Sequence, residues 1–180
     1  MEGVWGSGKT NLAKMFCKKY DAILVNEPNH IKAGINNKNR AAVTNWYLRA
    51  HERNLKNGIK MLQKGKRVVI ERSMLSSIIF SRIVLKQQNT GILFRRFEKH
   101  LKTARNSMLR PIHFIYLDIR DLKVVINKMR KNHHLEKFAD PKFVKRFDQF
   151  LLKYLKILNK RKLIKFVRRS EINKFSKILK

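Results

Sequence analysis

Near its start the sequence reads Gly3-Val4-Trp5-Gly6-Ser7-Gly8-Lys9-Thr10, which matches the phosphate-binding pattern G-x-x-x-x-G-K-[ST] at every position. Glycines in such a loop let consecutive backbone N–H groups point at a triphosphate, and the following helix adds its positive end. Helically spaced apolar residues in 11–20 predict that helix. We expect all eight residues to bind ATP, with Lys9 at the β- and γ-phosphates and the Thr10 hydroxyl on Mg²⁺.

A phosphate loop normally follows a buried parallel strand, but only Met1 and Glu2 precede Gly3. The chain is a fragment, or its start has been placed too late, or its sheet lacks the usual first strand. We expect that strand to be missing, which would leave backbone groups of its neighbours unpaired at about 1 to 3 kcal/mol each. The chain should then be marginally stable, and the DNA directly upstream should encode an in-frame apolar run of about 5 to 6 residues.

The composition fits one domain covering residues 1–180, because 43% hydrophobic residues suffice for a core. Lys and Arg number 43 against 12 Asp and Glu, which gives a formal net charge of +31. This charge is typical of nucleic-acid or anionic-surface partners. It is equally what a compositionally biased genome would impose on any fold, and we favour that interpretation.

The single cysteine, Cys17, excludes a disulfide framework and a cysteine metal site. No apolar run approaches the ~18 residues that span a bilayer. We therefore expect a cytoplasmic protein with no membrane association, and we leave a homodimer open.

Apolar runs alternate with helical patterns along the chain, which predicts an α/β fold. The runs lack polar alternation except in the last one, so we expect strands buried on both faces of a parallel sheet. Ligands of such sheets lie beyond the carboxyl ends of the strands, which would gather Glu27, Glu71, Arg72 and Asp118 around the phosphate loop. The expected strands are 22–25, 68–70, 112–118 and 163–167, and the expected helices are 11–20, 39–63, 77–87, 92–107, 121–131, 141–158 and 171–179.

Five stretches in this order resemble the thymidylate kinase and deoxynucleoside kinase branch of the phosphate-loop nucleotide kinases. They are Glu2 to Thr10, Glu27-Pro28, Ala50-His51-Glu52-Arg53, Glu71-Arg72-Ser73 and Tyr116-Leu117-Asp118. The resemblance covers nearly the whole chain. It implies a three-layer kinase fold with sheet order 2-3-1-4-5, in one domain with a basic lid at about residues 130–140.

The two branches predict different acceptors. The segment around Arg53 is similar to the part of thymidylate kinases in which an arginine holds the acceptor phosphate. Glu71-Arg72-Ser73 is similar instead to deoxynucleoside kinases, where Glu27 would be the general base on the 5′-hydroxyl. We favour the nucleotide, with dTMP converted to dTDP, and keep the deoxynucleoside as the alternative. A nucleotide-gated nucleic-acid binder with weak or lost kinase activity is a hypothesis of another class.

The resemblance also implies individual roles in catalysis. Lys9, Arg72 and Arg130 would neutralise charge in the transition state, Arg130 from the lid with Lys131, His133 and His134. Thr10 and Glu71 would hold Mg²⁺, the latter through water, while Glu27, Arg53 and Arg72 would bind the acceptor. Each has a plainer interpretation: a salt bridge for Glu27, a solvated rim for Glu71 and Arg72, and a solvated helix face for Arg53. We expect Trp46 and Tyr47 to belong to the core.

Overall fold

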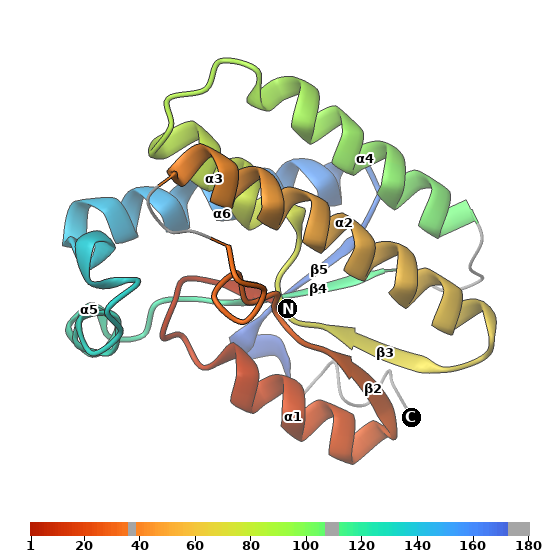
Figure 1. The fold of residues 1–180 in the computed structure, drawn as a ribbon. Coiled ribbons are helices and arrows are strands. Elements are labelled where there is room, and N and C mark those ends of the chain that lie inside the picture. The colour runs from red at the N-terminus through yellow and green to blue at the C-terminus, as the bar shows by residue number, and fades with distance from the viewer. Residues whose placement is uncertain (36–38, 107–111, 173–180) are drawn as a thin grey trace.

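The computed structural model describes residues 1–35, 39–106 and 112–172 (Figure 1). The strands are β1 (Glu2–Gly3), β2 (Ala22–Val25), β3 (Arg67–Ile70), β4 (His113–Leu117) and β5 (Lys165–Arg168). The helices are α1 (Lys9–Tyr20), α2 (Arg40–Gln63), α3 (Met74–Ile83), α4 (Thr90–Asn106), α5 (Leu122–Arg130) and α6 (Pro141–Lys160). Short 3-10 helices cover Glu136–Phe138 and Arg169–Glu171.

All strand pairs are parallel, and their arrangement follows the expected order 2-3-1-4-5. β2 pairs with β3, while β1 pairs with β4 and β4 with β5. Met1 joins the two groups of strands, because its amino group donates to the Ile70 carbonyl at 2.6 Å and its carbonyl accepts from the Arg72 N–H at 2.9 Å. The expectation of a missing first strand is therefore corrected. A two-residue strand, Glu2–Gly3, stands in the central position and ends where the phosphate loop begins.

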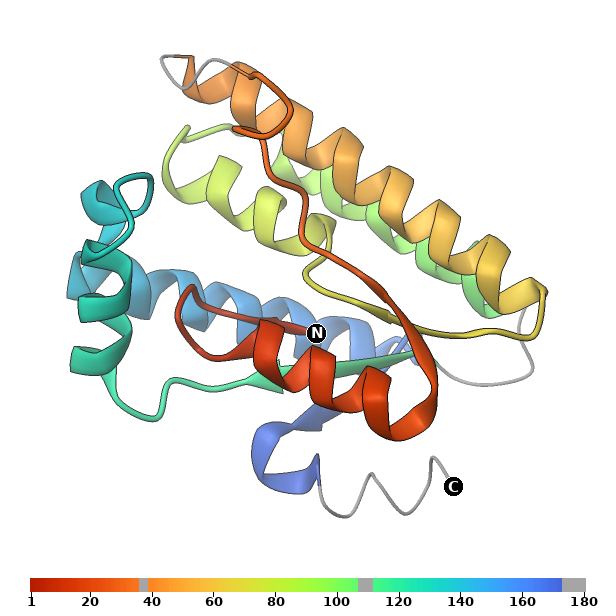
Figure 2. The ribbon, with the colours of Figure 1, turned by 60° about the horizontal axis from the view of Figure 1, so that its bottom comes forward.

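Helices cover both faces of the sheet in three layers (Figure 2). On one face α2 and α4 both pack against α3, and α3 also contacts α6. On the other face α1 lies against β2 and β3. The larger core forms around fully buried side chains such as Leu75, Phe97 and Phe147.

Burial of the strands differs from the expectation. Four of the five residues of β4 are buried, but β2 and β3 contain only half-buried and exposed residues. For β2 the reason is its place at the edge of the sheet, and for β3 the reason is that β1 is so short. It pairs with the last part of β4 alone, so most of β3 has no strand partner on that side within the described residues.

Several element boundaries also differ from the expectation, and two starts have a clear physical cause. α3 begins at Met74, three residues early, because the Ser73 side chain caps it by accepting from the N–H of Leu75. β5 begins at Lys165, since Leu163 and Ile164 are buried in the core ahead of the ladder. The predicted closing helix, 171–179, lies almost entirely outside the described residues. Within the described residues, no helix is both long and apolar enough to cross a membrane.

Candidate active site

The loop between β1 and α1 has the tight curvature that its glycines permit. Gly6 and Gly8 have φ values of 78° and 91°, a region of backbone conformation that residues with side chains rarely adopt. The Lys9 ammonium is buried under the loop and donates to the Val4 carbonyl at 2.9 Å. Burial and the nearby Arg72 lower the pKa of Lys9 to about 7. Lys9 therefore lies beneath the site expected for phosphate, and an anion bound there would favour its charged form.

Thr10 and Glu71 come together across the base of the site. The Thr10 hydroxyl, in the first turn of α1, donates to the Glu71 carboxylate at the end of β3, at 2.5 Å. Hydroxyl and carboxylate oxygens are the ligands that Mg²⁺ prefers, and Mg²⁺ keeps several waters beside one or two such groups. The pair fits a site that holds Mg²⁺ next to the phosphates of ATP.

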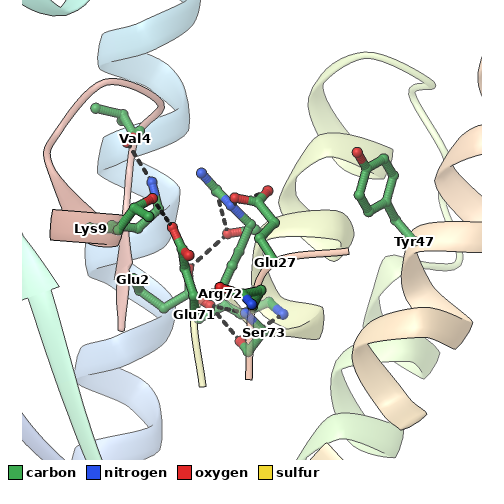
Figure 3. A network of polar contacts seen from close by, with 12 residues as sticks. Glu2, Val4, Lys9, Glu27, Tyr47, Glu71, Arg72 and Ser73 are labelled. Carbon is green, nitrogen blue, oxygen red and sulfur yellow. Dashed lines mark hydrogen bonds and ion pairs between the residues drawn. The ribbon is translucent and has the colours of Figure 1, made fainter. Parts of the chain in front are cut away.

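A buried carboxylate in β1, that of Glu2, fixes the segment that leads from β3 into α3. Glu2 accepts hydrogen bonds from the Ser73 N–H at 2.7 Å, the Ser73 hydroxyl at 2.5 Å and the Ser76 hydroxyl at 2.8 Å. Its side chain is fully buried, so these three donors replace the water that it loses. The contacts hold the start of α3 and the adjacent Arg72 in place (Figure 3).

Arg72 is the buried cation at the centre of the network in Figure 3. Its Nε atom lies 2.7 Å from the Glu27 carboxylate, its Nη1 atom donates to Ser76 at 2.9 Å, and its guanidinium lies over the Trp5 ring at 4.8 Å. Burial works to raise the pKa of Glu27, but Arg72 and Lys9 outweigh it and hold that pKa below its usual value. Glu27 is therefore ionised at neutral pH.

A cavity of about 590 Å³ opens beside Glu27, Glu71 and Arg72. This volume suits a nucleoside-sized ligand. α2 and α3 form its side walls, and residues 132–135, 137 and 138, in the expected lid segment, close its outer end. The cavity therefore runs from the phosphate loop to the lid.

The α2 wall contains polar residues that the sequence analysis did not assign to the site. Tyr47 projects toward the space beside Glu27 and hydrogen-bonds to His30 at 2.9 Å (Figure 3). His51 stacks on Tyr47, with ring centroids 5.8 Å apart, and is 2% exposed. Both line the cavity. Their signal in the sequence was polar groups at helical spacing on a stripe otherwise expected to be apolar.

The remaining expected site residues do not all line the main cavity. Arg53 is exposed and lines a second, more open hollow of about 680 Å³, on the other side of Glu27 and Pro28. Arg130 is exposed at the end of α5, and Lys131 is exposed next to it. Neither is among the described residues that line the main cavity, whereas His133 and His134 are. Trp46 lines the second hollow and Tyr47 the first, so neither is simply a core residue.

Comparisons with known proteins agree with this architecture. The family profile described as thymidylate kinase matches residues 1–176. The fold is similar to deoxyadenosine kinase from M. mycoides, solved with the products dCMP and a flexible dCDP. The TM-score is 0.58 at 16% identity, over 98% of this chain and 97% of that chain. The same enzyme with bound dATP gives 0.58 at 16% identity, over 92% of this chain and 86% of that chain. No curated protein sequence matches this chain.

Proposed function

The chain belongs to the thymidylate kinase family, and on that premise we propose that it transfers the γ-phosphoryl group of ATP to the 5′-hydroxyl of a deoxynucleoside. Membership of the family supports phosphorylation of a nucleoside or a nucleotide. One observation favours the nucleoside: an ionised carboxylate, Glu27, lies in the acceptor cavity 2.7 Å from Arg72. An acceptor hydroxyl requires a base at that position, whereas an acceptor phosphate would meet a negative charge there.

The reaction follows from these positions. The 5′-oxygen of the acceptor attacks the γ-phosphorus while its proton passes to the Glu27 carboxylate. The bond from that phosphorus to the β–γ bridging oxygen breaks, and the electron pair leaves with ADP. Arg72, fixed by Glu27, Ser76 and Trp5, donates to the oxygens of the transferring group, and Lys9 does so from beneath the loop.

We assign the metal site to Thr10 and Glu71. Mg²⁺ bound there would neutralise the charge that develops on the β- and γ-phosphates. We further propose that residues 1–180 form one cytoplasmic kinase domain whose segment 130–140 acts as the lid. Closing it would exclude water from the cavity.

A nucleotide acceptor such as dTMP remains the second candidate function. The observation in its favour is the second hollow, where Arg53 and Lys32 lie beside Glu27 and Pro28. An acceptor phosphate reaching round these two residues would meet both cations there. This arrangement would leave the main cavity for the base.

Nucleic acid is a weaker candidate partner. Exposed cations occur on several helices, such as Lys14 and Lys18 on α1, Lys99 and Lys102 on α4, and Lys153 and Lys156 on α6. A surface charged on several sides attracts polyanions without a defined site, and salt screens that attraction. We therefore propose non-specific, salt-sensitive nucleic-acid binding at most.

A coupled ADP-release assay tests the proposal. We expect ATP turnover that depends on a deoxynucleoside, when the four deoxynucleosides and their 5′-monophosphates are each supplied with Mg²⁺. ADP released with monophosphates alone would favour the dTMP-type reaction. No acceptor-dependent ADP release from a protein that melts cooperatively would contradict both.

A further inference from the structure

The main cavity contains a buried polar group that the proposed reaction does not use. His51 lines the cavity on α2 and is 2% exposed. Within the residues that the structure describes, neither of its ring nitrogens has a hydrogen-bond partner. Buried polar groups are nearly always paired in folded proteins, so an unpaired imidazole in a cavity wall indicates a group that a ligand satisfies.

The protonation state of His51 defines what it can bind. Burial lowers the pKa of His51 to about 4 and outweighs the opposite effect of Glu27. The ring is therefore neutral at physiological pH, with one nitrogen that donates and one that accepts. A hydroxyl group, which both donates and accepts, is a matching partner.

The position of His51 in the cavity indicates which hydroxyl group of the acceptor it can bind. The residues of α2 that line the cavity run from Arg40 through Thr44 and Tyr47 to His51. His51 ends this stripe and interacts electrostatically with Glu27 and Arg72. Four residues of helix, about 6 Å, separate it from Tyr47. An acceptor with its 5′-oxygen at Glu27 would place its sugar by His51 and its base farther out.

We propose that His51 binds the 3′-hydroxyl of the acceptor sugar and so determines the selectivity of this site for deoxynucleosides over 2′,3′-dideoxynucleosides. The inference rests on the proposed function, because it needs an acceptor whose 5′-hydroxyl lies at Glu27. The 3′-hydroxyl is the only other group on the deoxyribose that can both donate and accept a hydrogen bond, as the neutral His51 ring requires. An acceptor without it would leave the imidazole unpaired in the closed cavity.

The test compares the best deoxynucleoside from the acceptor screen with its 2′,3′-dideoxy analogue. We expect the wild-type kcat/KM to favour the deoxynucleoside by about 5- to 150-fold, the range for a buried group left unpaired. In His51→Phe, which keeps a flat ring but cannot hydrogen-bond, the ratio should fall close to one. The ratio should fall because kcat/KM for the deoxynucleoside falls, while kcat/KM for the dideoxy analogue stays the same. His51→Gln should retain part of the ratio, and Arg49→Ala, an exposed position on the same helix, should retain all of it.

Several results would overturn the inference. A wild-type ratio near one does so without any variant, as does an unchanged ratio in His51→Phe or His51→Gln. If His51→Phe lowered kcat/KM equally for the deoxynucleoside and for its dideoxy analogue, the role of His51 would be structural. The proposed function would survive all of these, because deoxynucleosides would still be phosphorylated. If a folded wild-type protein that binds ATP phosphorylated no nucleoside, the proposed function would fail and this inference with it.

Discussion

Glu27→Gln should lower kcat/KM for a deoxynucleoside by about 10²- to 10⁴-fold, the contribution of a positioned general base. Glutamine keeps the shape of the side chain and can still accept from Arg72, but it cannot take the 5′-hydroxyl proton. The variant should bind ATP normally, because the proposed contacts to ATP and Mg²⁺ come from the phosphate loop and Glu71 and do not include Glu27. Steady-state kinetics with the deoxynucleoside varied, together with an ATP titration, measure both quantities.

Arg53→Ala is the matched test of the second candidate function. Arg53 is exposed and outside the main cavity, so its loss should change kcat/KM for a deoxynucleoside by no more than about twofold, a surface-substitution effect. If the acceptor were a nucleotide held by Arg53, the loss of a charge-assisted contact would cost about 1.5 to 3 kcal/mol, or roughly ten- to a hundredfold. Glu27→Gln would then be mild, since an ionised phosphate needs no base. Small effects on kcat/KM from both variants would contradict both acceptor assignments.

Lys9→Ala should lower kcat by about 10²- to 10³-fold, as expected when one preorganised donor to a developing charge is removed. Lys14→Ala is the control, because Lys14 lies exposed on the same helix and should leave kcat unchanged. Single-turnover kinetics at saturating ATP separate this effect from weaker ATP binding. A Lys9→Ala enzyme with wild-type turnover would contradict the assignment of the loop to ATP.

The lowered pKa of Lys9 allows a second, independent test of its contact with ATP. It is lowered to about 7 without ligand, mainly by burial, and bound phosphate should raise it again. ATP binding should therefore take up a proton above about pH 7, and ATP affinity should fall as pH rises there. Above about pH 8 ATP is fully ionised, so Lys9 alone should account for the trend. Calorimetry in buffers of different ionisation enthalpy detects the proton, and Lys9→Ala should abolish its uptake.

The sequence could predict that Glu27 and Glu71 lie close together, because this follows from sheet geometry. Both residues follow neighbouring parallel strands, and the carboxyl ends of such strands lie at one edge of the sheet whatever the conformation of the connecting segments. Thr10 and Lys9 start the helix after the loop, at the same edge. The short central strand could not be predicted. The backbone of Met1 and Glu2 extends it without any apolar run to indicate a strand.

Residues on the long helix were harder to place, because their roles depend on its rotation about its own axis. A change of one residue turns a side chain by about 100°. Arg53 and His51 are two residues apart, yet Arg53 lies in the open hollow and His51 in the main cavity. Tyr47 and His51 also have the spacing of core residues, since a buried cavity wall and a packed core share one periodicity. Only the structure, with its unpaired imidazole, separates the two cases.

The most direct test of the central claim supplies a deoxynucleoside and its 5′-monophosphate together, in equal amounts, with ATP and Mg²⁺. Phosphorus NMR then follows the phosphomonoester signal of the monophosphate while ADP accumulates. A 5′-hydroxyl acceptor creates a phosphomonoester, so we expect this signal to grow in step with ADP. A phosphomonoester signal that shrinks as ADP appears would mean that the enzyme phosphorylates the monophosphate, and it would contradict a 5′-hydroxyl acceptor.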